Sequence, residues 1–425
     1  MLEIAKIRQK TEEIAGNLAR KGVANAADVL QEILRLDDRR KEIITELEKY
    51  RAEMNQTSKS IGLLMREGKK DEAEAAKKQT AEAKARIKEL EQEVSDVQTR
   101  TKHELDELPN TPHASVPTGK SVEDNEVVFE RGEAVTYDFT PKPHWELARQ
   151  HDIIDWELGA KLTGAGFPVY KGDGAILQRA LISFFLDKAR EAGYQEIQSP
   201  LMVNEDSAYA TGQLPDKEGQ MYHIEKDGFY MIPTAEVPIT NLYRNDIIAM
   251  DRLPLKNCGY TPCFRREAGS YGAHVKGLNR LHQFDKVELV QVCLPEKSYD
   301  TLEEMTAYVE TLLEALELRF RRLLLCSGDM SHASAKTFDL EVFSAAQERW
   351  LEVSSVSNFE TFQTNRLKLR YRTEENKKLL LHSLNGSALA LPRIVAALLE
   401  NHQQADGSIR IPEALRPYTR FDQIG

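Results

Sequence analysis

Hydrophobic residues repeat at helical spacing in the first quarter of the chain and at mixed spacings afterwards. From about residue 27 to residue 108 they recur alternately every three and four positions, which is the heptad pattern of a coiled coil. The apolar core positions of a first register are Ile33, Leu36, Ile43, Leu47, Tyr50, Met54, Ile61 and Leu64. Those of a second register are Ala73, Ala76, Ala83, Ile87, Leu90, Val94 and Val97. The pattern predicts two long helices packed along one seam.

A short polar break separates the two registers. It reads Glu67-Gly68-Lys69-Lys70, and a glycine turn of this kind joins antiparallel helices. A helix from Ala27 to Met65 would be about 58 Å long at the usual rise per residue, so the hairpin must project as an arm. Residues 1 to about 25 are predicted to form a short helix that packs back on the body of the protein.

A proline-rich junction marks the end of the helical pattern. Pro109, Pro112 and Pro117 interrupt the helix, and beyond them helical and strand patterns alternate. One clear helix is predicted over 174–192, followed by Gly193 and a strand that ends at Pro200. We therefore expect an N-terminal domain over 1–108, with the arm at about 27–108, a linker over 109–125, and a second domain over 126–425.

The segment from Thr261 to Glu288 carries the most distinctive chemistry. Its flanks read as strands and its middle contains Gly269, Gly272 and Gly277, so it predicts an antiparallel hairpin with a loop that can approach a ligand closely. A guanidinium fork suits a phosphate, a carboxylate can accept from an exocyclic amine, and an aromatic ring can stack on a purine. The segment is thus equipped for ATP without a P-loop. The alternative is a solvated hairpin with ordinary surface charges.

Three further groups of polar residues stand at the ends of predicted elements. Thr234 and Glu236 follow a strand and precede a helix, where they could cap that helix or bind a ligand. Glu352 and Ser355, predicted to follow a strand, are hard oxygen ligands for Mg²⁺ or an ordinary strand-end cap. Arg393 stands in the first turn of a helix that begins at Pro392, where a cation opposes the helix dipole and a triphosphate would explain it.

Composition and charge exclude some classes of protein. The chain has 425 residues and a net charge of −11, which argues against DNA or other nonspecific nucleic-acid binding by the whole surface. No apolar run is long enough for a membrane span, and the start lacks a secretion signal, so we expect a cytoplasmic protein. The four cysteines form no CxxC pair. The arm tip is locally basic through Lys59, Arg66, Lys69 and Lys70, which suits a phosphate backbone, or else a solvated face of a dimerisation coiled coil.

These motifs together resemble a known family. Phe264-Arg265-x-Glu267, its long loop and Phe284 resemble motif 2 of the class II aminoacyl-tRNA synthetases, and the wording HQFDKVE is similar to that of seryl-tRNA synthetases. The helix, glycine, strand and Pro200 resemble motif 1, and the strand before Pro392-Arg393 resembles motif 3. The resemblance implies an α+β fold, with an antiparallel catalytic sheet flanked by helices and a coiled-coil arm that grips tRNA.

The resemblance also implies a function: a ligase that forms seryl-adenylate from serine and ATP and transfers serine to tRNA(Ser), with tRNA(Sec) as a possible further substrate. It implies a homodimer through motif 1, and Arg265 and Arg393 as catalytic residues. The implied serine-binding residues are Thr234, Ala235, Glu236, Arg265, Glu288 and Ser387. The implied ATP-binding residues are Arg265, Arg266, Glu267, Phe284, Glu352, Val353, Ser354, Ser355 and Arg393, with Glu352 and Ser355 holding Mg²⁺.

Three alternative functions fit parts of the same pattern. A ligase of the same fold that charges a carrier protein would not need the arm, and a non-catalytic tRNA-binding relative would not need Arg265, Glu267, Glu352 and Arg393 together. A different amino-acid specificity is a third alternative. The chain also departs from the family pattern. Asn279 stands where many relatives have an apolar residue, Val356 and Phe359 where they have Cys, and Ser331-His332 where they have Gly-Phe.

Overall fold

The computed structural model describes residues 1–267 and 275–425. These residues form two compact units, one spanning Leu2–Pro109 and the other Met1 with Asn110–Gly425. The loop glycines Gly269 and Gly272, which belong to the predicted hairpin, lie outside the described residues.

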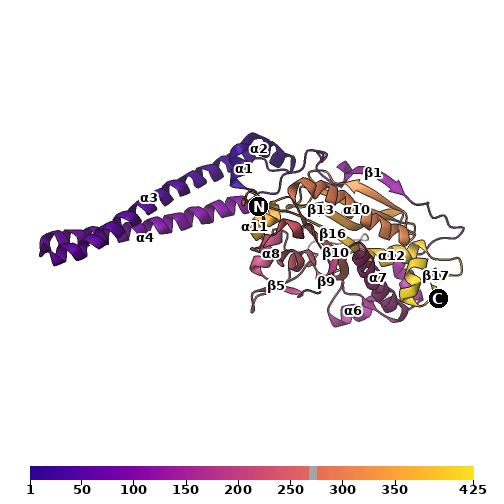
Figure 1. The fold of residues 1–425 in the computed structure, drawn as a ribbon. Coiled ribbons are helices and arrows are strands. Elements are labelled where there is room, and N and C mark those ends of the chain that lie inside the picture. Colours follow the sequence, from indigo (N-terminus) through magenta and orange to yellow (C-terminus); the bar gives the residue numbers. More distant parts are fainter. Residues whose placement is uncertain (268–274) are drawn as a thin grey trace. The chain divides into compact units, whose positions relative to one another are not determined.

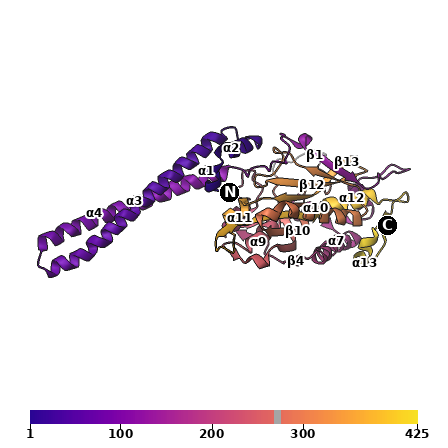
Figure 2. The same ribbon diagram turned by 45° about the horizontal axis from the view of Figure 1, so that its top comes forward.

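The first unit is dominated by two long helices, α3 (Ala26–Arg66) and α4 (Lys70–Glu107), which run side by side (Figures 1 and 2). The turn between them falls at residues 67–69, which confirms the predicted break. The seam is apolar, as the heptads predict, and its buried core comprises Leu36, Ile43, Leu47, Ile87, Leu90 and Val97. Near the tip, the seam positions Ile61 and Leu64 are half-buried, while Leu63 and Met65, which lie outside the seam, are exposed.

Charged pairs flank this seam instead of filling it. Arg86 of α4 pairs with Glu46 of α3, and Arg39 of α3 pairs with Glu93 of α4, all with partly exposed side chains. Pairs of this kind contribute little to stability, at most about 1 kcal/mol each. The arm is therefore held mainly by burial of its apolar stripe.

The N-terminal segment differs from the prediction of one short helix. It forms two helices, α1 (Ile4–Gln9) and α2 (Thr11–Arg20), because the backbone leaves the helical region at Lys10. Both helices pack on α3. Arg8 of α1 reaches Asp37 and Asp38 of α3, with a nitrogen–oxygen distance of 2.9 Å to Asp37.

The second unit is built on an eight-stranded sheet in the order β1-β11-β12-β13-β16-β10-β9-β4. All neighbouring strands are antiparallel except β4 and β9. The strands are β1 (Glu126–Arg131), β11 (Phe320–Leu324), β12 (Lys336–Ser344), β13 (Arg349–Asn358), β16 (His382–Ala390), β10 (Gln283–Cys293), β9 (Leu255–Phe264) and β4 (Gln195–Glu196). This antiparallel sheet confirms the α+β expectation.

Three helices cover one face of this sheet: α7 (Gly172–Glu191), α10 (Ser298–Ala315) and α12 (Leu391–Asn401). Their apolar side chains form one core with alternate residues of the strands, such as Val287 and Leu289 of β10. Because side chains alternate along a strand, the intervening residues point to the other face of the sheet. Glu288 of β10 and its partner Ser387 of β16, two of the candidate site residues, lie on that second face.

Smaller elements surround the sheet. The short helices are α5 (His144–Gln150), α6 (Trp156–Leu162), α8 (Glu205–Thr211), α9 (Glu236–Asn241), α11 (Phe362–Leu367) and α13 (Arg416–Thr419). The short strands are β2 (Ile154–Asp155), β3 (Val169–Tyr170), β5 (Met202–Asn204), β6 (His223–Ile224), β7 (Phe229–Met231), β8 (Ile247–Ile248), β14 (Arg370–Arg372), β15 (Lys378–Leu380), β17 (Ile409–Arg410) and β18 (Gln423–Ile424). The motif 1 pattern predicts a strand between Gly193 and Pro200, and β4 covers Gln195–Glu196 of that span.

From Asn110 onward, the proline-rich junction is part of the second unit. The buried Asn110 side chain donates to the carbonyl oxygens of Ala333 and Phe359, at 3.0 and 2.9 Å. All four cysteines are buried and free. Across residues 1–267 and 275–425, no helix is long and apolar enough to cross a membrane.

Candidate active site

The predicted hairpin is formed by β9 and β10. Phe264 pairs with Gln283 and Gly259 pairs with Glu288, so the two strands run antiparallel along their whole length. Arg265 follows β9, and its guanidinium carbon lies 5.2 Å from the centre of the Phe284 ring. The ring and the cation that could stack on a purine and hold a phosphate are therefore neighbours, as the hairpin predicts.

The next charged residues connect the two sides of the loop. Glu267 has a left-handed backbone, with φ of 49°, and its carboxyl group pairs with Arg280. Arg266 is exposed, and its backbone N–H donates to the carbonyl of Gln220. In the described part of the loop, the pair of Glu267 and Arg280 thus links the residue after β9 to the segment before β10.

A buried polar cluster lies beside this hairpin. The Lys286 ammonium is 2.5 Å from the Glu288 carboxyl group, and it donates to the Thr234 hydroxyl at 2.9 Å. The Thr234 hydroxyl in turn donates to Glu288 at 3.0 Å. Ser387 on β16 stands opposite Glu288 in the sheet. Three of the predicted serine-binding residues are therefore brought together, and Lys286 joins them.

Glu236 stands at the edge of this cluster, in the first turn of α9. Burial, and after it the charge of Glu288, raises the pKa of Glu236 to about 7. The side-chain amide of Gln363 donates to Glu236 at 2.5 Å. Thr234 also accepts from the Glu236 backbone N–H at 3.3 Å, but the N-cap residue of α9 is Ala235, which makes no side-chain cap hydrogen bond. Ala235 instead packs in a small apolar cluster with Ile239 and Val290.

Glu352 and Ser355 were predicted to follow a strand, and this is wrong, because both lie inside β13. Residues three apart in a regular strand point to opposite faces. Here a bulge leaves Val353 without a partner, so that Glu352 stands opposite Glu341 and Ser355 opposite Asp339. The bulge brings Glu352 and Ser355 to the same face.

The two residues line a polar cavity of about 510 Å³ over β11, β12 and β13. Burial, and then the charge of Glu352, raises the pKa of Asp339 well above its usual range. Burial also raises the pKa of Glu341. The buried side chain of Val353 belongs to the core, and the Ser354 hydroxyl donates to the Ser387 carbonyl at 2.6 Å. Neither of these two side chains lines the cavity.

Arg393 reaches this region from α12. The helix begins directly after β16, with Pro392 in its first turn, as the sequence predicts. The Arg393 guanidinium donates to the Glu352 carbonyl at 2.7 Å and to the Asn279 carbonyl at 3.2 Å. Arg393 therefore bridges the bulged strand and the segment before β10.

Glu352 and Ser355 could hold a magnesium ion only if other ligands completed its coordination shell. The described residues contain no group of three or more His, Cys, Asp or Glu side chains that could hold a metal ion. Mg²⁺ commonly takes one or two protein oxygens and completes its shell with water and substrate phosphates. Glu352 and Ser355 fit an ion of that kind, shared with a bound triphosphate.

Sequence reasoning missed several residues of this region. Lys286 occurs inside a strand of alternating character, on the same face as Glu288, and that alternation is the signal that could have revealed it. Glu400 is a lone charge at the end of an apolar helix face, which also indicates a buried role. No local pattern marks Gln363 or Asp339, because their positions depend on packing between distant segments.

Two family models match parts of this chain and identify its class of protein. The model of the class II tRNA synthetase core domain (G, H, P, S and T) matches residues 218–402, which include the hairpin, the bulged strand and α12. The model of the seryl-tRNA synthetase N-terminal domain matches residues 1–112. The fold is thus that of a class II aminoacyl-tRNA synthetase.

Similarity over the whole length identifies the family within this class. The chain is 54% identical to a serine–tRNA ligase of Salinibacter ruber, covering 100% of this chain and 99% of that protein. It is 48% identical to a serine–tRNA ligase of Methylacidiphilum infernorum, covering 100% of both. The crystal structure of seryl-tRNA synthetase from Pyrococcus horikoshii complexed with ATP matches with a TM-score of 0.92 at 33% identity, covering 100% of this chain and 99% of that one. The chain belongs to the seryl-tRNA synthetase family.

Proposed function

We propose that this protein activates L-serine with ATP and transfers it to the 3′ end of tRNA(Ser). The supporting observation is the buried cluster of Thr234, Lys286 and Glu288, next to Arg265 and Phe284. It is an amino-acid-sized set of polar groups beside a cation and a ring suited to a nucleotide. Membership of the seryl-tRNA synthetase family supports the same assignment.

The chemistry of activation needs positioning and charge neutralisation more than a nucleophilic side chain. The serine carboxylate attacks the α-phosphorus of ATP, forming a carbon–oxygen–phosphorus linkage while pyrophosphate leaves. Arg265 holds the α-phosphate, and Arg393 holds the distal phosphates. Phe284 stacks on adenine, and Glu267 accepts from its amino group. Arg266 and the backbone of Val353 and Ser354 complete the nucleotide contacts.

Serine selection rests on the buried cluster. Glu236 and Thr234 bind the serine ammonium, while Glu288 and Ser387 bind its hydroxyl. A site built to hydrogen-bond a hydroxyl rejects the analogue lacking it strongly, on the order of 10⁴-fold, because its buried polar groups would be left unpaired. Alanine is therefore a poor substrate in this proposal.

A magnesium ion belongs to the proposed site. Glu352 and Ser355 would hold it, and it would supply charge neutralisation on the triphosphate. The cavity next to them contains further carboxyl groups, Asp339 and Glu341, whose raised pKa values show that burial disfavours their charge. Those two residues are not assigned as ligands.

In the second step, a terminal ribose hydroxyl of the tRNA attacks the carbonyl carbon of seryl-adenylate and AMP leaves. The arm supports this step, since Lys59, Arg66, Lys69 and Lys70 at its tip are exposed and can contact phosphates. A homodimer formed through the motif 1 region, a cytoplasmic location and tRNA(Sec) as a second acceptor belong to the same proposal. So does the division into domains 1–108 and 126–425.

The test is amino-acid-dependent exchange of pyrophosphate into ATP in the absence of tRNA, comparing serine with threonine, alanine and glycine. The proposal predicts exchange with serine and much slower exchange with the other three. Exchange with a different amino acid would keep the fold and overturn the specificity. If none of the four supports exchange, with or without tRNA, the activation chemistry is wrong.

A further inference from the structure

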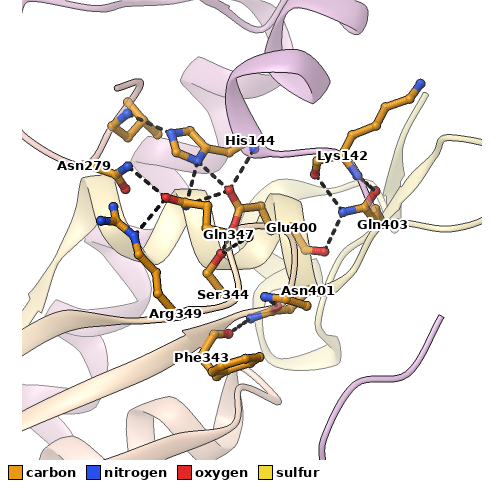
Figure 3. Close-up of polar contacts among 12 residues, drawn as sticks. Lys142, His144, Asn279, Phe343, Ser344, Gln347, Arg349, Glu400, Asn401 and Gln403 are labelled. Carbon is orange, nitrogen blue, oxygen red and sulfur yellow. Dashed lines mark hydrogen bonds and ion pairs between the residues drawn. The ribbon is translucent and has the colours of Figure 1, made fainter. Parts of the chain in front are cut away.

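A closed ring of hydrogen bonds passes through His144, Glu400, Gln347 and Asn279 (Figure 3). The Leu278 backbone N–H donates to His144 Nε2 at 2.8 Å, and His144 Nδ1 lies 2.7 Å from Glu400 Oε1. The Gln347 amide donates to the same Glu400 oxygen at 2.9 Å, and the Asn279 amide donates to Gln347 Oε1 at 3.0 Å. The ring thus starts at Leu278 and returns to its neighbour Asn279.

The centre of the ring is fully buried. His144 and Glu400 both have 0% of their surface exposed. Glu400 also accepts from the His144 backbone N–H at 2.9 Å and from the Ser344 hydroxyl. Because Leu278 donates to Nε2, the imidazole proton is on Nδ1 and points at Glu400. Each partner therefore fixes the orientation of the next, which is how outer groups orient a functional side chain.

The ring holds the segment that precedes β10. Gly277 lies so close to His144 that a Cβ atom added there would be 2.2 Å from Nε2, so the backbone is seated against the imidazole. Asn279 is 5% exposed and its carbonyl accepts from Arg393 Nε at 3.2 Å. Arg393 and Glu400 stand on the same helix, α12. The ring therefore fixes the distance between this segment and the helix that carries Arg393.

We propose that His144 and Glu400 are positioning residues for nucleotide binding: they hold the Asn279 carbonyl where it aims the Arg393 guanidinium at the phosphates. The inference rests on the proposed function, because it takes Arg393 as a ligand of ATP. The polar ring also accounts for Asn279, which stands where many relatives have an apolar residue. In this chain its side chain closes the ring through Gln347.

The decisive pair of variants is His144→Asn and His144→Gln. The Asn amide can still donate to Glu400 but is too short to accept from Leu278, whereas the Gln side-chain oxygen reaches the position of Nε2. In the serine-dependent exchange assay, we expect His144→Asn to raise the KM for ATP about tenfold, the effect of one lost hydrogen bond. The KM for serine should stay within about twofold, and His144→Gln should recover most of the loss.

A matched control separates positioning from core packing. His402 is also buried and follows the same helix, but its Nε2 lies 3.0 Å from the Leu316 carbonyl, away from the segment before β10. His402→Asn should lower the melting temperature without changing the KM for ATP. Gln347→Leu, at a half-buried position, should raise that KM severalfold even if His144→Asn folds poorly.

Equal rises in the KM for ATP and for serine, or a KM for ATP that is unchanged in both His144→Asn and Gln347→Leu, would overturn the positioning role. If His144→Asn and His144→Gln raised the KM for ATP equally, the hydrogen bond from Leu278 would not be the basis of the positioning role. Failure of the proposed function is a different result, because the unmodified protein would then show no exchange.

Discussion

One ion pair between the two helices of the arm and one in the catalytic unit lie in opposite environments. On the arm, the side chains of Arg86 and Glu46 are 38% and 36% exposed, and the buried positions of the seam are mostly apolar. In the catalytic unit, the side chains of Lys286 and Glu288 are only 7% and 2% exposed. Burying such a pair costs free energy that exposed pairs do not cost. The difference fits the proposed function, in which the catalytic unit buries charge to recognise serine and the arm tip presents exposed charge to tRNA.

The largest effect should come from removing the cation at the hairpin. Arg265→Ala should lower kcat/KM for serine-dependent exchange on the order of 10³-fold, because an oriented donor to developing charge is lost. The melting temperature should change little, since the side chain is only half-buried and makes one long hydrogen bond, 3.4 Å to Pro233. Arg372→Ala, on the exposed side of β14, is the control and should leave exchange unchanged. A loss confined to stability would contradict the role of Arg265.

A second experiment compares the two kinds of ion pair directly. Lys286→Met leaves Glu288 buried without its cation and should lower the free energy of unfolding by about 3 kcal/mol. Arg86→Met breaks an exposed pair on the arm and should cost less than about 1 kcal/mol. Denaturant unfolding, monitored separately for the arm and the catalytic unit, measures both. Equal costs would remove the contrast between the two units.

The pH dependence of stability should have opposite signs in the two units. In the folded protein the pKa of Glu236 is raised from 4.5 to about 7. Between these two pH values, the folded form keeps a proton that the unfolded form releases. Its contribution to stability is present below about pH 4.5 and is lost as the pH rises through about 7. Glu236→Gln should therefore flatten the decline of unfolding free energy between pH 5 and pH 8.

The counterpart on the arm is Asp37. Burial opposes its charge, but hydrogen bonds from Lys41, Arg40 and Arg8 outweigh burial and lower its pKa to about 2. Its contribution is present above about pH 3.8 and is lost as the pH falls toward 2. Asp37→Asn should make the arm less stable at neutral pH and less sensitive to acid. The same pH series tests both residues, and like signs for the two would refute this assignment.

The arm could be predicted almost entirely from the sequence. Heptad spacing determines which side chains meet along a two-helix seam, so Leu36, Ile43 and Leu90 could be placed by counting alone. The turn at residues 67–69 follows from the same pattern. The N-terminal helices were less accessible, because the break at Lys10 depends on backbone geometry that no proline or glycine marks.

The catalytic site could be predicted only in part. The hairpin and the start of α12 follow local rules of alternation and of proline at a helix start. The bulge at Val353 has no sequence signature, so the strand containing Glu352 and Ser355 was predicted to end too early. The ring of His144, Gln347 and Glu400 joins segments far apart in the chain, and no local pattern reveals it.

The most direct test of the account asks whether the arm serves tRNA charging and not serine activation. It measures both reactions in one arm variant, in which Lys59, Arg66, Lys69 and Lys70 are all changed to Gln. These side chains are exposed, so the fold should persist. We predict that serine-dependent pyrophosphate exchange stays within about twofold. Charging of tRNA(Ser) should fall on the order of 100-fold in kcat/KM, because contacts to several phosphates are lost. Unchanged charging, or an equal fall in exchange, would contradict the separation of tRNA binding in the arm from activation in the catalytic unit.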